Sequence, residues 1–154
     1  MSTHRHVILV TAPRERPEFR LVIAFLWHDA KDVDTDGDSN NPASREWTEL
    51  YIQNRADTDE VVDILPQEES PLVLRVESDR DYLAARVAYF LAVHMGGEVR
   101  VSAKGPYMNP DGLLPLLGDF DRDAAMRRVA DSPFSRSSPE HPYPDLDNER
   151  DTRR

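Results

Sequence analysis

The densest group of chemically active side chains in this sequence is an acidic segment, residues 29–38. It holds five aspartates and one lysine: Asp29, Lys31, Asp32, Asp34, Asp36 and Asp38. The whole chain carries a formal net charge of −10. Carboxylates at this density either ligate a hard cation or form an acidic surface that attracts a positively charged partner. Both are binding roles, and neither requires a covalent bond to be made or broken.

The acidic segment matches the first half of an EF-hand calcium loop, with aspartates at alternate positions and Gly37 at the sixth position. The second half departs from that pattern. The twelfth position, where a bidentate glutamate closes the calcium shell, is Ala43, and Glu46 comes three residues too late. A solvated acidic loop is the simpler interpretation, so we assign no metal ligand. Calcium binding by the Asp32–Asp38 loop stays an alternative.

Patterns that support catalysis are otherwise sparse. The five histidines, none of them in a paired metal-binding spacing, are His4, His6, His28, His94 and His141. The absence of cysteine excludes disulfides, thiolate metal sites and cysteine nucleophiles. The chain also lacks a glycine-rich phosphate loop and a serine in a glycine-flanked turn. We predict a protein that is not an enzyme and needs no cofactor; a small enzyme using His28 with nearby carboxylates is the alternative.

The charge balance predicts the kind of partner. An isoelectric point near 4.9 disfavours nucleic acid, because contacts with phosphates need lysine and arginine. The same charge favours a basic protein partner, which carboxylates would attract and aromatic side chains would anchor. We predict that the partner contacts Asp32, Asp34, Asp36, Asp38, Trp47 and Tyr51, although a tryptophan such as Trp47 more often belongs to the core. No apolar run is long enough to span a bilayer, so we expect a cytoplasmic protein without membrane contact.

Short apolar and alternating segments predict a sheet. The expected strands are residues 6–11, 47–53, 61–65, 72–77 and 98–102. Residues 19–27 are almost continuously apolar; we favour a strand there over a short buried helix. Residues 47–54 also fit a helical spacing, and that alternative stays open. Residues 29–44 have almost nothing to bury and are expected to form a surface loop.

Helices are expected in the second half of the chain. Ser78 can cap a helix over residues 79–95, whose apolar stripe places His94 on the inward side and which Gly96 ends. Shorter helices are expected at residues 110–117 and 122–130. Together these elements predict a single α+β domain over residues 1–130. It has a mainly antiparallel sheet of about five strands packed by one long helix, and two short C-terminal helices. The proline-rich residues 131–154 are predicted to be an extended or disordered C-terminal arm.

Three segments carry a resemblance to known proteins. Residues 71–99 run from a strand into a helix that ends in Gly-Gly-Glu-Val, residues 118–121 read Gly-Asp-Phe-Asp, and residues 142–146 read Pro-Tyr-Pro-Asp-Leu. Together they resemble small actinobacterial proteins, some of which are similar to the immunity proteins that accompany polymorphic toxins. The resemblance implies a compact inhibitor that neutralises a basic toxin or effector domain, and it carries over no functional residue.

Overall fold

One antiparallel sheet organises the chain. The computed structural model describes residues 6–27, 33–102 and 105–144. In this part of the chain the sheet has six strands in the order β2-β3-β4-β5-β1-β6. Their bounds are β1 His6–Thr11, β2 Val33–Gly37, β3 Leu50–Asn54, β4 Val61–Glu69, β5 Leu72–Ser78 and β6 Val99–Arg100. The predicted α+β class with a mainly antiparallel sheet is therefore confirmed.

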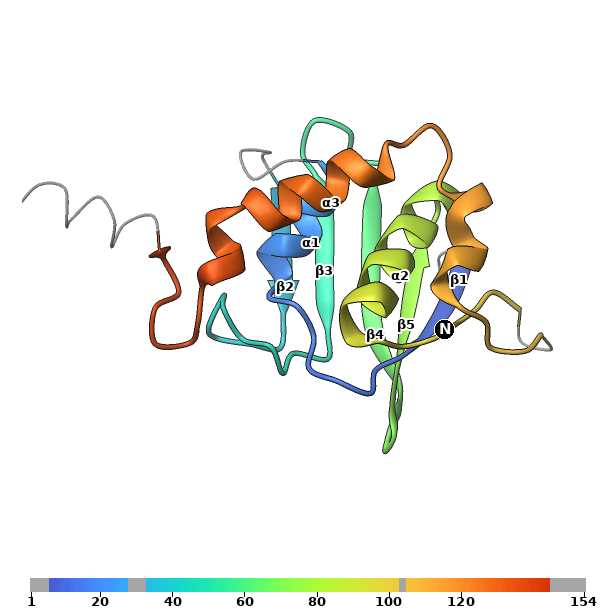
Figure 1. Cartoon of the computed structure of the whole chain (residues 1–154), viewed down its shortest axis with the longest axis horizontal. Coiled ribbons are helices and arrows are strands. Elements are labelled where there is room, and N and C mark those ends of the chain that lie inside the picture. The colour runs from blue at the N-terminus through green and yellow to red at the C-terminus, as the bar shows by residue number, and fades with distance from the viewer. Residues whose placement is uncertain (1–5, 28–32, 103–104, 145–154) are drawn as a thin grey trace, which may run out of the picture.

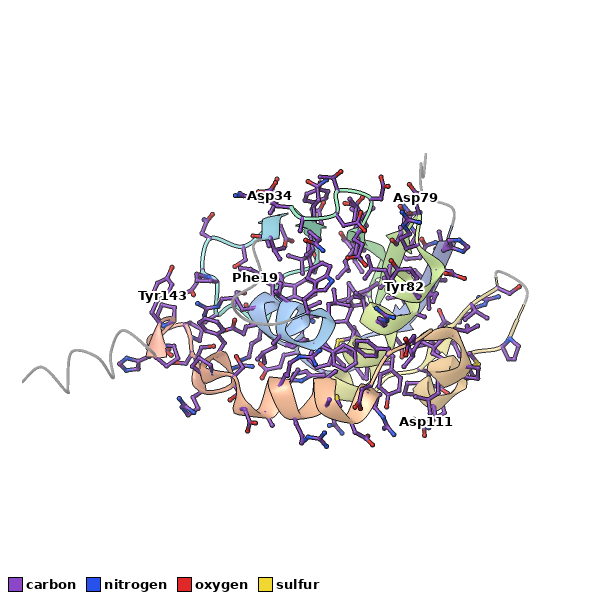
Figure 2. The ribbon with its side chains drawn as sticks, turned by 90° about the horizontal axis from the view of Figure 1, so that it is seen from above. Phe19, Asp34, Asp79, Tyr82, Asp111 and Tyr143 are labelled. Atoms are coloured by element: carbon purple, nitrogen blue, oxygen red, sulfur yellow. The ribbon has the colours of Figure 1, made fainter. Side chains whose placement is uncertain are left out.

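The helices cover one face of this sheet. Their bounds are α1 Phe19–Leu26, α2 Asp81–Met95 and α3 Arg122–Asp131, with 3-10 turns η1 Pro110–Leu116 and η2 Pro133–Arg136. Figure 1 shows α1 and α2 in front of the strands and α3 across the outer side of α1. Seen from above in Figure 2, α3 and the sheet lie on opposite sides of α1. The other face of the sheet has no helix on it among the described residues.

The hydrophobic core lies between the sheet and α1 and α2. Alternate strand residues point into it, and those that are 6% exposed or less include Ile8, Val10, Leu50, Ile52, Val62, Ile64, Leu74 and Val76. This period of two is what buries a single face of a sheet. On the helical side, Phe25 of α1 stacks on Phe90 of α2 with ring centroids 4.9 Å apart. The remaining strand residues consequently point away from the helices.

The prediction of a strand at residues 19–27 is wrong, because Phe19–Leu26 forms α1. Every residue from Leu21 to Leu26 is buried, since α1 packs against α2 and α3 as well as the core. The segment is only eight residues long and holds one polar residue, Arg20, and so short an apolar run does not distinguish a buried helix from a buried strand. Arg128 of α3 donates to the carbonyls of Ala24 and Phe25, which lie in the last turn of α1.

The predicted surface loop at residues 29–44 contains a strand, so that prediction is wrong for Val33–Gly37. In β2 the side chains of Asp34 and Asp36 alternate with those of Val33 and Thr35. The dense aspartates mask this alternation in the sequence, and pairing with β3 is what holds the segment extended. The adjacent segment, predicted as strand 47–53 with a helical alternative, is a strand from Leu50.

The long helix α2 ends as predicted but begins differently. Gly96 adopts a left-handed conformation with φ of 68°, which confirms the predicted C-cap. The N-cap is Arg80 rather than Ser78, because the Ser78 hydroxyl donates to the carbonyl of Val61 at 2.6 Å and accepts from the amide of Arg80. His94 is exposed at the last turn, contrary to the predicted inward orientation.

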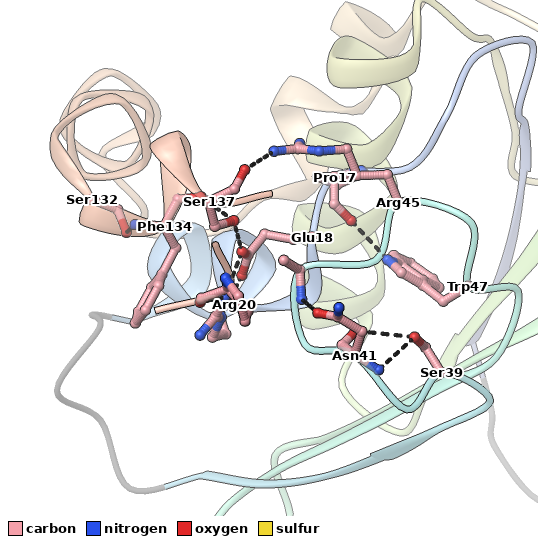
Figure 3. A network of polar contacts seen from close by, with 12 residues as sticks. Pro17, Glu18, Arg20, Ser39, Asn41, Arg45, Trp47, Ser132, Phe134 and Ser137 are labelled. Carbon is pink, nitrogen blue, oxygen red and sulfur yellow. Dashed lines mark hydrogen bonds and ion pairs between the residues drawn. The ribbon is translucent and has the colours of Figure 1, made fainter. Parts of the chain in front are cut away.

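The first residue of the predicted C-terminal arm, Asp131, belongs to α3, and the rest of its described part, residues 132–144, packs on the domain (Figure 3). Side-chain donors hold three of its backbone carbonyls: Arg45 donates to Ser137, Asn41 to Pro139 and Arg20 to Pro142. The segment thus includes the turn η2 and is bound at several points along its length. The predicted arm residues 145–154 lie outside the described residues.

One tight contact between α2 and the sheet gives a test of the fold. A Cβ atom on Gly97 would lie 2.1 Å from the Thr11 carbonyl oxygen, so the backbone of β1 would have to move in Gly97→Ala. We expect Gly97→Ala to lower the free energy of unfolding by about 2–3 kcal/mol in urea denaturation. Gly105→Ala is the control, because its nearest neighbour would be the Ser102 Cβ at 3.4 Å. Equal stabilities of the two variants would contradict this packing.

Candidate functional site

The helix-free face of the sheet, here called the open face, carries an ordered row of carboxylates. Across the strands, Asp36 pairs with Tyr51, Tyr51 with Asp63, and Asp63 with Glu77. Directly paired residues of antiparallel strands point to the same face. Their neighbours Leu50, Ile52, Ile64 and Val76 are buried under the helices, so the row lies on the open face. Three acidic groups and one tyrosine are thereby aligned across β2 to β5.

A shallow depression surrounds Tyr51 on this face. It has a volume of about 200 Å³, and four carboxylates line it: Asp36, Asp38, Glu49 and Asp63. Leu65 adds an apolar wall. None of the described residues that line the depression is basic. These carboxylates come from β2, from the segment between β2 and β3, and from β4, and they surround one aromatic ring. Such an environment suits a cationic group.

Two ion pairs flank the acidic row. On β5, the Glu77 carboxylate is buried, and its Oε1 lies 2.7 Å from Nε of Arg75, which points to the same face. At the other end, Asp34 of β2 pairs with Arg55, and both side chains are about half exposed. These arginines offset part of the repulsion between neighbouring carboxylates. Figure 2 shows Asp34 on the side of the sheet away from α3.

Asp38 has a structural role in addition to its charge. Its carboxylate accepts hydrogen bonds from the Thr48 hydroxyl at 2.7 Å, the Thr48 amide at 3.0 Å and the Glu49 amide at 3.1 Å. Partial burial raises the pKa of Asp38, but these hydrogen bonds lower it by more, so the pKa of this carboxyl lies below its usual value. Asp38 thus closes the loop between β2 and β3 and stays ionised.

The predicted partner-binding residues divide into three groups. Asp34, Asp36 and Tyr51 lie together on the open face, and Asp38 lines the depression beside them. Trp47 was predicted as an anchor, which is wrong: it is 3% exposed and donates its indole N–H to the Pro17 carbonyl at 2.7 Å. Asp32 lies outside the described residues, as does His28 of the alternative enzyme prediction.

The structure of β2 bears on the calcium alternative. In an EF-hand loop, aspartates at alternate positions ligate a single calcium ion at the centre of the loop. In β2 the side chains of Asp34 and Asp36 stand side by side along an extended strand. Across the described residues, no group of three or more His, Asp or Glu side chains is arranged to hold a metal ion. The part of the acidic segment that the structure describes presents its carboxylates as a surface.

Sequence reasoning missed a second polar cluster, which holds the arm (Figure 3). Glu18 is fully buried, and its carboxylate accepts from Nε and Nη2 of Arg20 and from the Ser137 hydroxyl. The Arg20 guanidinium also lies 4.0 Å from the ring centroid of Phe134. Glu18 and Ser137 are 119 residues apart, so no local signal in the sequence indicates the contact. With its oxygens engaged by Arg20 and Ser137, Glu18 fastens the arm.

Comparisons with known proteins give no family for this chain. No protein-family model matches the sequence, and no curated protein or solved structure matches it either. In the described residues, no helix combines the length and apolar character needed to cross a membrane.

The buried Glu18 cluster should contribute strongly to stability. Glu18→Gln leaves the largely buried Arg20 guanidinium without its counter-charge, so we expect the free energy of unfolding to fall by about 3–5 kcal/mol. Asp59→Asn is the control, since it removes an exposed ion pair with Arg80 and should cost less than about 1 kcal/mol. Urea denaturation measures both. Equal losses would show that the Glu18 pair is no stronger than a surface pair.

The hydrogen bonds to Asp38 predict a change in its titration. Thr48→Val removes the hydroxyl donor, so the pKa of Asp38 should rise toward its usual value, whereas Thr48→Ser should keep it low. Because the folded pKa is below the unfolded one, Asp38 stabilises the fold above about pH 4, and this contribution is lost as the pH falls through the folded pKa. NMR titration of the carboxyl carbon measures both variants. An unchanged pKa in Thr48→Val would contradict the assignment.

Proposed function

We propose that this chain is a non-catalytic binding protein that neutralises a basic toxin or effector domain, as immunity proteins do. The observation that supports it most is the carboxylate-lined depression around Tyr51 on the open face. Basic residues of a partner would enter this depression and meet four carboxylates there. The partner's own active surface would be covered as a result, which is how a binding protein without catalytic groups can inhibit.

The way the charges are held supports a binding role. Asp36 and Asp63 stand on β2 and β4, the two strands that pair with β3, in a sheet whose other face is packed by helices, so their positions are set before any partner arrives. The carboxylates around Tyr51 bring like charges close together, and like charges repel one another. A cationic partner removes that repulsion. Pre-positioned charges also spare the partner the entropy cost of ordering a flexible acidic loop.

The distribution of charge over the molecule would orient a partner. The open face carries the acidic row, whereas in α3, on the far side of the helical layer, Arg122, Arg127 and Arg128 are balanced by Asp123, Asp131 and the N-cap residue Asp121. A basic protein approaching by diffusion is therefore attracted more strongly to the open face than to α3, where the formal charges cancel. Long-range steering of this kind raises association rates and weakens as salt is added.

The proposed contact surface differs in part from the predicted one. It keeps Asp34, Asp36, Asp38 and Tyr51, and it adds Glu49 and Asp63 from the walls of the depression. Tyr51 takes the role first given to Trp47, because its ring lies among the carboxylates and is partly exposed. Tyrosine offers a large contact area at a small entropy cost, which suits the centre of an interface.

Removing charge from the open face should weaken inhibition. The test variant combines Asp36→Asn, Glu49→Gln and Asp63→Asn, and it is produced together with each basic domain encoded beside this chain's gene. We expect wild-type protein to restore growth of cells that make the toxic domain, and the variant to restore it poorly. With purified proteins, the association rate constant of the variant should be at least about tenfold lower at low salt, with a flatter salt dependence.

A matched control removes three charges from the helical side. Asp111→Asn, Asp123→Asn and Asp131→Asn change the net charge by the same amount, but their sites are on η1 and α3, away from the open face. This control should protect cells as wild type does. If both triple variants lose protection equally, net charge rather than the open face is responsible. If neither loses it, the proposed surface is wrong.

A further inference from the structure

The outer edge of β2 is open for pairing with another strand. β2 (Val33–Gly37) is the first strand in the sheet order and pairs only with β3 among the described residues. Edge strands present backbone donors and acceptors that can pair with an added chain, and they are a common route of peptide recognition. The opposite edge is different, because β6 is bridged at Val99 by Met108.

The pairing of β2 with β3 establishes which backbone groups face outward. The amide of Asp38 donates to the Glu49 carbonyl at 3.4 Å, so every second residue back from it, Asp36 and Asp34, also faces β3. In an antiparallel pair the intervening residues direct their backbone away from the partner. The N–H and C=O of Thr35 therefore point outward. The neighbouring outward amide, that of Gly37, already donates to Oδ1 of Asp36 at 2.9 Å.

The surroundings of this edge differ on the two faces of the sheet. On the open face, the side chains of Asp34 and Asp36 flank Thr35. On the helical side lies a hollow of about 380 Å³, whose lining includes Phe19, Thr35 and Tyr143. Tyr143 is half exposed there. Alternate side chains of an added strand would point to opposite faces of the sheet. Those on the open face would contact carboxylates, and those on the helical side would contact aromatic rings.

A second copy of this chain is a poor occupant of the edge. Antiparallel pairing of two β2 strands would place Asp34 and Asp36 of one copy opposite the same residues of the other. Like charges directly opposed across strands are destabilising. The carboxylate of Asp36, and that of Asp34 once a partner's cation replaces Arg55, favour a strand with lysine or arginine at the facing positions.

We propose that the outer edge of β2 binds an extended segment of the partner as a seventh strand of the sheet. One residue of that segment pairs with Thr35 and directs an apolar side chain toward the hollow. The residues before and after it are basic and lie over Asp34 and Asp36. The choice of a basic partner rests on the proposed function, whereas the pairing itself depends on the backbone of Thr35.

A pair of modified peptides tests the pairing directly. The probe is a blocked peptide of alternating arginine and valine, five residues long, with valines at its second and fourth positions. A valine opposite Thr35 would donate its amide to the Thr35 carbonyl, whereas the arginine amides would point away from β2. We expect N-methylation of the valines to weaken binding at least about tenfold, and N-methylation of the arginines to change it little. Fluorescence anisotropy measures the dissociation constants.

Variants of Thr35 provide the complementary test. Thr35→Pro removes an N–H that points outward, so the β2–β3 hydrogen bonds remain and the fold should be kept, as circular dichroism would show. It should bind the unmodified probe at least about tenfold more weakly than wild type. Thr35→Val, which keeps the N–H, should bind as wild type does. Isotope-edited NMR should show the Thr35 amide shielded from exchange when the probe is bound.

The outcomes separate the two proposals. If the two N-methylated peptides bind equally, or wild type does not bind the probe at all, strand addition at β2 is wrong whatever the fate of the proposed function. If Asp34→Asn with Asp36→Asn leaves probe binding unchanged, the assigned partner chemistry is overturned. Association of the protein with itself that is lost in Thr35→Pro would assign the edge to a second copy and overturn the proposal.

Discussion

Burial of α1 and α2 against a single face of the sheet is the interaction on which the rest of the structure depends. It requires strand residues such as Ile52, Ile64 and Val76 to face the helices, and it thereby directs their neighbours Tyr51, Asp63 and Glu77 to the opposite face. A shift of one residue in register would exchange the two sets and place carboxylates in the core. The acidic open face is thus a geometric consequence of core packing.

The open face brings several like charges close together. Asp63 and Glu77 stand directly opposite one another on β4 and β5, where like charges repel. Arg75 offsets this at Glu77, and Arg55 pairs with Asp34 at the outer strand. Positions at which a local rule is broken are where functional surfaces are expected. These charges would give a basic partner both attraction and orientation.

The outer edge of β2 also combines charge with a binding surface. Its carboxylates disfavour pairing between copies of this chain, and Asp36 already satisfies the outward amide of Gly37. Thr35 is left in the middle with its backbone directed outward. The open face and the adjoining edge of β2 can contact one partner together. The open face supplies electrostatic attraction, and the edge supplies directional hydrogen bonds. Register along β2 would then determine which partner side chains meet Asp34 and Asp36.

The sequence by itself determined the class of the fold, the strands at residues 6–11 and 72–77, the end of α2 at Gly96 and the acidic character of the surface, because each follows from local spacing or composition. Only the tertiary structure decided that residues 19–26 are helical, since a short apolar run fits a buried helix and a buried strand equally well. It also turned part of an apparent loop into β2 and placed Trp47 in the core. Asp36, Tyr51 and Asp63 lie side by side because of the strand register, and Glu18 contacts Ser137 because of long-range packing. Neither arrangement can be read from the order of residues along the chain.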